Sequence, residues 1–241
     1  MILQSFRRYE RKYLLNRAQL EALLPVLKAH MDFDAFCPDG KTYEITDLYF
    51  DTPGHEIVRG CALETGFKEK LRLRFYSPFF NADTPCFLEY KKKLGKLGGK
   101  RRAPVTAGEA EDFLCRGIVP RTQDPVTREI FTEIQHFISG RLLQPAARVH
   151  YRRLALFGRD CPELRATIDC ALCAEILSPN PSEILRIPLL EEGGYLLEIK
   201  VPGAMPLWLS PVLSQLHLFS QSHSKYGRAW QLARLRQLRQ A

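Results

Sequence analysis

The chain lacks any apolar run approaching the roughly 20 residues of a membrane-spanning helix, and its N-terminal residues contain no hydrophobic segment of signal-peptide length. Both absences argue for a cytoplasmic protein with no membrane span. Its 241 residues contain no internal repeat and no low-complexity linker. We therefore expect a single domain over residues 1–241.

The usual signatures of catalytic and metal centres are also missing. There is no G-x-S-x-G, no Walker A motif and no H-E-x-x-H, and the histidines lack metal-ligand spacing. Seven cysteines are scattered without paired spacing, which argues against a disulfide framework. Cys170 and Cys173 form a C-x-x-C with no matching second pair, so we interpret them as buried thiols. No protein nucleophile is indicated.

Positive charge is in excess. The formal net charge is +8 and the pI is about 9.2, which indicates an anionic partner: nucleic acid, phosphates or a membrane surface. Net charge alone does not choose among them. RNA binding has no further support, because the aromatic residues mostly occupy apolar strand faces rather than alternating with exposed cations.

The most informative segment is Lys-Leu-Arg-Leu-Arg-Phe-Tyr, residues 70–76. Its period of two predicts a strand with Lys70, Arg72 and Arg74 on one face and apolar residues on the other. Five further segments show the same alternation of apolar and charged faces. They are residues 6–14, 86–93, 149–155, 163–171 and 195–201.

Two architectures fit this pattern. In one, an antiparallel sheet packs its apolar face on helices and exposes its charges to solvent. In the other, the strands close into a barrel with a charged interior, in which crowded like charges would repel one another unless a polyanion neutralised them. The strand pattern by itself favours the open sheet.

The remaining elements complete an α+β chain. Residues 42–51 read as another strand, and 94–102 as a hairpin turn or a mobile basic loop. Apolar periodicity and capping residues predict the helices. These span 16–31, 106–116, 124–139, 205–218 and 224–238.

Carboxylates share strand faces with the cations: Glu10, Glu89, Asp169 and Glu198. They suit structural ion pairs, or a divalent cation that bridges phosphate oxygens. Ser224 and Lys225 begin the last helix, where a phosphate site or simple capping both fit.

Eight short motifs resemble, in order, those of one family. They are Tyr9–Tyr13, Leu48–Thr52, Leu71–Tyr76, Phe87–Lys91, Tyr151–Arg153, Leu197–Lys200, Pro206–Leu209 and Ser224–Tyr226. The chain resembles the VTC (vacuolar transporter chaperone), or polyphosphate polymerase, domain of the triphosphate tunnel metalloenzyme (CYTH-like) superfamily. The resemblance runs over nearly the whole chain.

The resemblance implies a closed antiparallel β-barrel, a triphosphate tunnel with a charged lumen and flanking helices. It implies a metal-dependent transfer of the γ-phosphate of ATP, or another triphosphate, to a growing inorganic polyphosphate chain. Glu198 would bind Mn²⁺ or Mg²⁺. The catalytic phosphate ligands would be Lys12, Arg72, Arg74, Lys91, Arg153, Arg165 and Lys225. Further substrate-binding residues would be Glu10, Lys70, Glu89, Lys93, Lys200 and Ser224.

The sequence departs from the family before Ser224, where Ser222-His223 stands in place of a further lysine. The basic stretch 96–102 is expected to guide polyphosphate. Any membrane-protein partner would be a separate subunit. Two alternatives stay open: a tripolyphosphatase or nucleoside triphosphatase with water as acceptor, and a non-catalytic polyphosphate-binding module.

Overall fold

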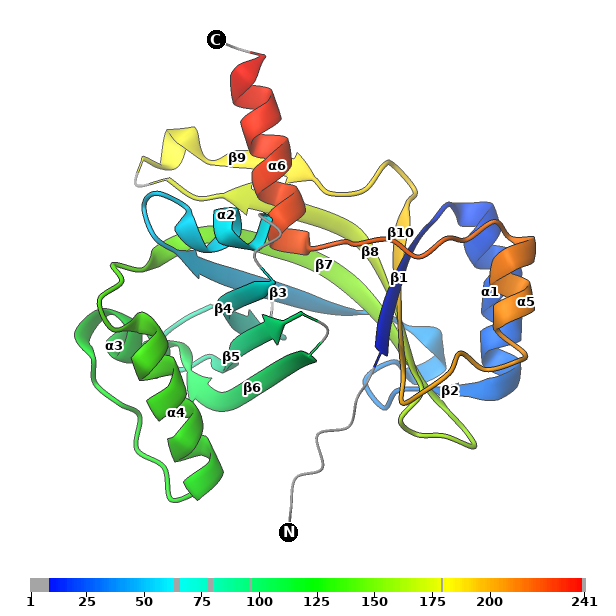
Figure 1. Cartoon of the computed structure of the whole chain (residues 1–241), viewed down its shortest axis with the longest axis horizontal. Coiled ribbons are helices and arrows are strands. Elements are labelled where there is room, and N and C mark those ends of the chain that lie inside the picture. Colours follow the sequence, from blue (N-terminus) through cyan, green and yellow to red (C-terminus); the bar gives the residue numbers. More distant parts are fainter. Residues whose placement is uncertain (1–8, 63–65, 78–79, 96, 179, 240–241) are drawn as a thin grey trace. The chain divides into compact units, whose positions relative to one another are not determined.

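A computed structural model describes residues 9–62, 66–77, 80–95, 97–178 and 180–239. Strands form over the segments in which apolar and charged residues alternate, because successive side chains of a strand point to opposite faces of the sheet. The strands, labelled in Figure 1, are β1 (Tyr9–Leu15), β2 (Met31–Phe33), β3 (Tyr43–Asp51), β4 (Phe67–Phe75), β5 (Pro85–Leu94), β6 (Leu97–Thr106), β7 (Gln144–Gly158), β8 (Arg165–Ile176), β9 (Leu185–Pro188) and β10 (Tyr195–Val201).

Local capping residues set the helix starts. The side chains of Asn16, Thr106 and Asp124 each accept hydrogen bonds from backbone N–H groups of the first helical turn. Pro25 lies inside the first helix without ending it. The α-helices are α1 (Arg17–His30), α2 (Glu56–Ala62), α3 (Ala107–Arg116), α4 (Pro125–Ile138), α5 (Ser210–Gln215) and α6 (Lys225–Leu238).

The strands form an antiparallel sheet with the order β1-β10-β8-β7-β3-β4-β5-β6, to which β2 and β9 add at β7 and β8. The prediction of a closed barrel was wrong: in the part of the chain that the structure describes, β1 and β6 end this order and do not pair with each other. A closed barrel needs that last ladder of hydrogen bonds. The alternation of apolar and charged residues along a strand is the same in an open and in a closed sheet. The prediction of a closed barrel therefore depended on the family resemblance alone.

The prediction of a hairpin at 94–102 was right in part, because β5 and β6 pair from Leu94 and Leu97, but residues 97–102 belong to strand β6 and not to a turn or a loop. Gly98 and Gly99 give this stretch the composition of a loop. Pro104, further along β6, lacks an N–H donor, yet a proline is tolerated on an edge strand, and among the described strands β6 pairs with β5 alone.

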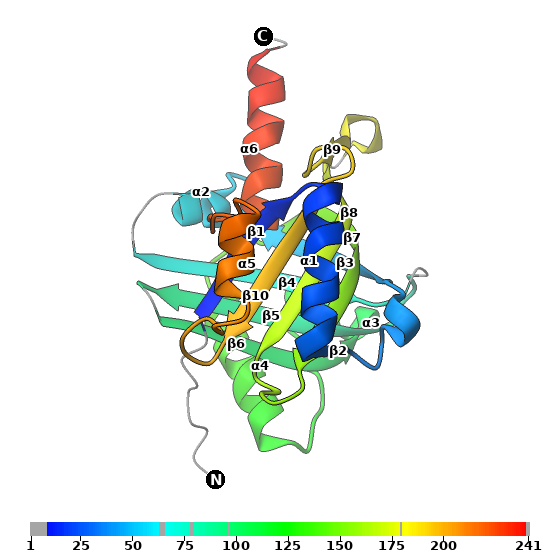
Figure 2. The same cartoon turned by 90° about the vertical axis from the view of Figure 1, so that its right-hand side faces the viewer.

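The chain divides into two compact units, through both of which β7 and β8 run. The expectation of a single domain stays a prediction. The first unit comprises residues 9–44, 151–172 and 190–223 of the described chain. Its core lies between the strands and helices α1 and α5, which Figures 1 and 2 show side by side. Leu23, Leu27, Leu197 and Ile199 are fully buried there.

The second unit comprises residues 45–150, 173–189 and 224–239. Its core packs the apolar faces of β4, β5 and β6 against α3 and α4. Leu71, Leu88, Phe113, Phe131 and Ile134 are almost completely buried. Burial of this face fixes the opposite face of the same three strands, which carries the charges.

Candidate functional site

The charged face of the second unit is organised in rows across three strands. Arg72 of β4 lies opposite Glu89 of β5, which lies opposite Arg102 of β6. The next row along the strands contains Lys70, Lys91 and Lys100. We call the set of Lys70, Arg72, Arg74, Glu89, Lys91, Lys100 and Arg102, together with Asp47, the β4–β6 cluster.

Asp47 of β3 holds the two arginines in place. Its Oδ1 accepts a hydrogen bond from Arg74 Nε at 2.7 Å, and its Oδ2 accepts from Arg72 Nη1 at 3.0 Å and Arg74 Nη2 at 2.9 Å. The carboxylate is fully buried. Burial alone would raise its pKa, but Arg72 and Arg74 keep the pKa of Asp47 well below its ordinary value. Both guanidinium groups are thereby fixed before any ligand arrives.

Glu89 is the second fully buried carboxylate of the cluster. Its Oε2 accepts from Arg72 Nε at 2.8 Å, while its Oε1 accepts from Arg102 Nε at 2.7 Å and lies 2.6 Å from Lys100 Nζ. Burial opposes ionisation, yet Arg72, Arg74 and Lys100 hold the pKa of Glu89 well below its ordinary value. Two carboxylates therefore face a larger number of cations, which leaves a net positive face.

Two lysines of the cluster, Lys91 and Lys100, have lowered pKa values. Repulsion by Arg72, followed by burial, lowers the pKa of Lys91 well below its ordinary value. Burial lowers the pKa of Lys100 to about 8, although Glu89 opposes the shift. A bound anion would relieve the repulsion among these cations.

The pKa of Lys100 predicts a pH dependence. Lys100 carries its charge below about pH 8, so anion affinity should fall as pH rises through this value. We expect wild type and Lys100→Arg to bind tripolyphosphate similarly at pH 7. At pH 9.5 wild type should bind about tenfold more weakly than the arginine variant, the effect of one charge-assisted hydrogen bond. Calorimetric titration at both pH values measures this, and a parallel decline of both proteins would contradict it.

The start of α6 belongs to the same unit and is firmly fixed. Lys70 Nζ donates to Ser224 Oγ at 2.7 Å, and Ser224 Oγ caps the helix through Gly227 N–H. Tyr226 donates its hydroxyl to Asp51 Oδ2 at 2.8 Å. Lys225, between these anchors, is buried. These bonds fix the residues on both sides of Lys225.

The first unit carries a separate charged face on β1, β10 and β8. Lys12 Nζ lies 3.0 Å from Glu10 Oε1 and 3.2 Å from Glu198 Oε1, and it donates to the carbonyl oxygen of His223 at 2.8 Å. Strand register explains the grouping, because Lys12 is opposite Glu198 and Glu10 is opposite Lys200. We call Glu10, Lys12, Arg153, Arg165, Thr167, Asp169, Glu198 and Lys200 the β10 cluster.

Arg153 is anchored inside the β10 cluster. It donates to both oxygens of Asp169, at 2.6 and 2.8 Å, and its Nη2 lies 3.7 Å from Glu198 Oε2. Asp169 is fully buried. Burial opposes the charge of Arg153, but Asp169 keeps the pKa of Arg153 well above its ordinary value. The bidentate geometry fixes the plane of the guanidinium.

Lys200 and Arg165 lie directly opposite each other on β10 and β8. Burial, with Arg153 and Lys12, lowers the pKa of Lys200 against the opposing effect of Glu10 and Glu198. Arg165 is exposed. Like charges placed in register are unfavourable without a counter-ion, and Lys200 has one in Glu10, with Nζ 3.7 Å from Oε2.

The β10 cluster offers only a few oxygen ligands for a divalent cation. Within the described residues, no group of three or more His, Cys, Asp or Glu side chains is placed to hold a metal. Mg²⁺ commonly takes only one or two protein carboxylates and completes its shell with water and substrate phosphates. Glu198 and Glu10 supply two, and the ammonium of Lys12 lies between them. Thr167, opposite Glu198, has a buried Oγ1 without a hydrogen-bond partner.

The structure distributes the predicted site residues over the two units. Lys12, Arg153, Arg165, Glu10, Lys200 and Glu198 lie in the first unit. Arg72, Arg74, Lys91, Lys225, Lys70, Glu89, Lys93 and Ser224 lie in the second. Lys93 is exposed near the end of β5 and joins no ion pair that the structure records among the described residues.

Sequence reasoning missed three members of the β4–β6 cluster. Lys100 and Arg102 were assigned to a hairpin turn or a mobile loop, and Asp47 was not considered. A signal for Asp47 did exist: on the strand 43–51 it shares a face with Tyr49 and Asp51, opposite Leu48 and Phe50, which belong to or pack against the apolar core.

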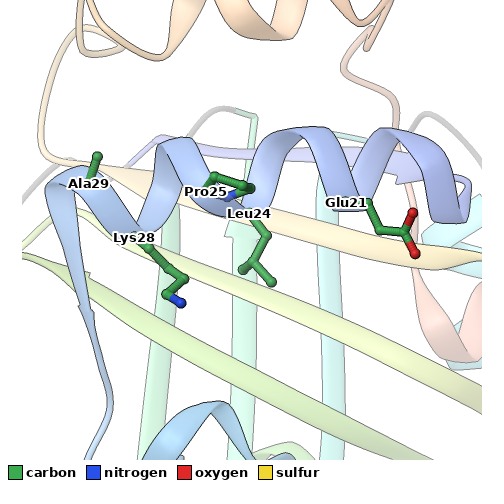
Figure 3. Close-up of a pocket in the computed structure, with 5 residues that line it drawn as sticks. All are labelled: Glu21, Leu24, Pro25, Lys28 and Ala29. Atoms are coloured by element: carbon green, nitrogen blue, oxygen red, sulfur yellow. The ribbon is translucent and has the colours of Figure 1, made fainter.

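The pocket in Figure 3 lies elsewhere. Its lining residues, Glu21, Leu24, Pro25, Lys28 and Ala29, all come from helix α1. It brings none of the predicted site residues together, so the charged strand faces remain the candidate sites.

Comparison with known proteins completes the description. The sequence model of the family described as the VTC domain matches residues 7–234. A search of curated proteins finds no match. A protein of Bacillus halodurans proposed to be an adenylate cyclase has 12% identity and a TM-score of 0.51, with 89% of this chain and 92% of that chain covered. At this identity the likeness is one of fold alone.

Two other solved structures are less similar. A proposed adenylate cyclase of Vibrio parahaemolyticus has a TM-score of 0.46 and 13% identity, over 92% of this chain and 97% of that one. A protein of Pyrococcus horikoshii OT3 has a TM-score of 0.46 and 14% identity, over 92% and 99%.

Proposed function

The chain belongs to the VTC domain family, and from this premise we propose that it is a metal-dependent polyphosphate polymerase that uses ATP. The observation that carries the proposal is the β4–β6 cluster. There, two arginines are fixed by a buried aspartate and surrounded by lysines whose pKa values are lowered.

Preorganised cations are what phosphoryl transfer requires. The reaction needs little covalent help from the protein and much positioning and charge neutralisation. In the proposal, Arg72, Arg74 and Lys91 bind phosphate oxygens in the second unit, together with Lys225. Lys12, Arg153 and Arg165 do so in the first unit. Glu10, Lys70, Glu89, Lys93, Lys200 and Ser224 support substrate binding through charge and hydrogen bonds.

The proposed reaction balances without a protein nucleophile. A terminal oxygen of the polyphosphate chain attacks the γ-phosphorus of ATP, the bond from that phosphorus to the β–γ bridging oxygen breaks, and ADP leaves. The chain gains one phosphate. This chemistry agrees with the absence of any nucleophile motif in the sequence.

Mn²⁺ or Mg²⁺ would be held by Glu198, with Glu10 beside it. When bound, such an ion neutralises charge on the phosphate oxygens. Glu198 forms ion pairs with Lys12 and Arg153, two of the proposed phosphate ligands, which supports its assignment as the metal ligand. None of the helices in the described chain is long and apolar enough to cross a membrane.

The experiment is an incubation of the purified protein with ATP and Mn²⁺, with and without a short polyphosphate primer, followed by gel electrophoresis of the products. We expect long chains together with ADP. Free phosphate without chains would replace the proposal with a tripolyphosphatase or nucleoside triphosphatase. Tight polyphosphate binding without turnover would replace it with a binding module.

A further inference from the structure

Two aromatic side chains, Tyr76 and Phe87, lie at one end of the β4–β6 cluster. Phe87 of β5 lies opposite Arg74 of β4, and Tyr76 follows Arg74 by two residues. The two rings meet edge to face, with centroids 6.0 Å apart and planes at 79°. Along the strands the order is therefore aromatic, then Arg72 and Arg102, then lysines. Each step of two residues is about 7 Å.

Arg102 joins the aromatic pair to the phosphate-binding rows. Its guanidinium carbon lies 4.4 Å from the centroid of the Phe87 ring, and its Nη2 donates to the Tyr76 hydroxyl at 3.1 Å. On its other side, Nε donates to Glu89. The Arg102 side chain is 35% exposed and Tyr76 is 41% exposed. A flat cation and an aromatic ring are thus held in fixed positions and remain accessible.

We infer that Tyr76, Phe87 and Arg102 bind the base of a nucleoside triphosphate by stacking. Guanidinium planes and aromatic rings are the groups on which nucleobases stack. The inference rests on the proposed function, because it places the phosphates of the same nucleotide on Arg72, Lys91 and Lys100. Stacking reads the π-face that all bases share. The phosphate donor is therefore a nucleoside triphosphate, with little preference among the bases. Inorganic tripolyphosphate has no base and lacks this contact.

The test compares ATP with tripolyphosphate on Tyr76→Leu and Phe87→Leu, each titrated by calorimetry with Mg²⁺ present. Loss of a stacking ring should weaken ATP binding by about tenfold. Affinity for tripolyphosphate should change by less than about twofold, because the cations stay in place. Phe80→Leu is the matched control: Phe80 is an exposed ring that contacts Phe75, and its loss should change neither affinity.

The outcomes separate this inference from the proposed function. Equal weakening of ATP and tripolyphosphate in the leucine variants, or no change in ATP affinity, would overturn the base site while phosphate binding stands. Failure of the wild-type protein to bind either ligand would overturn both. Strong preference of the wild type for one base among ATP, GTP, CTP and UTP would also overturn the stacking inference.

Discussion

Replacing Glu198 by Gln is expected to lower ATP turnover by about 100-fold or more, the usual effect of removing one preorganised charged group from a phosphoryl- or acyl-transfer site. The amide keeps the shape of the side chain but loses the charge that would hold a divalent cation. Tripolyphosphate affinity measured without metal should be unchanged or slightly higher, because a carboxylate that repels the anion is gone. The measurement is ATP consumption at saturating Mn²⁺, paired with metal-free calorimetry.

Glu175→Gln is the matched control. Glu175 lies on strand β8 and forms ion pairs with Arg148 and Arg186, but it belongs to neither cluster. Its loss should leave turnover within about twofold of wild type, since exposed ion pairs contribute little. Unchanged turnover in Glu198→Gln would remove Glu198 as the metal ligand.

Replacing Asp47 by Asn is expected to lower the free energy of unfolding by about 3–5 kcal/mol, because it leaves two buried guanidinium groups without their shared carboxylate. Arg72 and Arg74 are both buried. Added tripolyphosphate should recover part of the loss, since the anion would supply the missing negative charge and binds only the folded state. Urea unfolding with and without tripolyphosphate measures both effects.

Asp112→Asn is the control for this prediction. Asp112 pairs with Arg116 one turn away on the exposed face of α3, so its loss should cost less than about 1 kcal/mol. Equal stability of wild type and Asp47→Asn would show that Asp47 does not organise the arginines.

Acidification tests the same carboxylates without mutation. The folded-state pKa values of Asp47 and Glu89 lie below their ordinary values, so their contribution is fully present above those ordinary values. It is lost as pH falls below about 4. The urea midpoint should therefore drop between pH 5 and pH 3, and it should drop less in Asp47→Asn.

The strand faces were predictable because side-chain alternation is a local property. Leu71 and Leu73 had to be buried if Arg72 and Arg74 shared the other face, and the structure places both leucines in the core. The pairing of Glu198 with Lys12 was less accessible, since it depends on the register between β1 and β10. The register depends on which strands lie next to each other in the sheet. The alternation of apolar and charged residues does not predict which strands these are.

The same limit explains the errors. The stretch 94–102, most of which belongs to β6, was interpreted as a turn or loop because it is rich in glycine and lysine, although the pairing of β6 with β5 places Lys100 beside Lys91. Closure of the sheet was inferred from resemblance, and no local pattern could test it. Asp47 was overlooked because its two arginine partners lie 25 and 27 residues further along the chain.

Transfer of label from ATP would test the central claim most directly. The protein is incubated with ATP labelled at the γ-phosphate and an unlabelled short polyphosphate primer, and the chains and nucleotides are separated. The account predicts label in chains longer than the primer, with ADP formed in equal amount. Label found only in free phosphate, or retained in ATP, would contradict it.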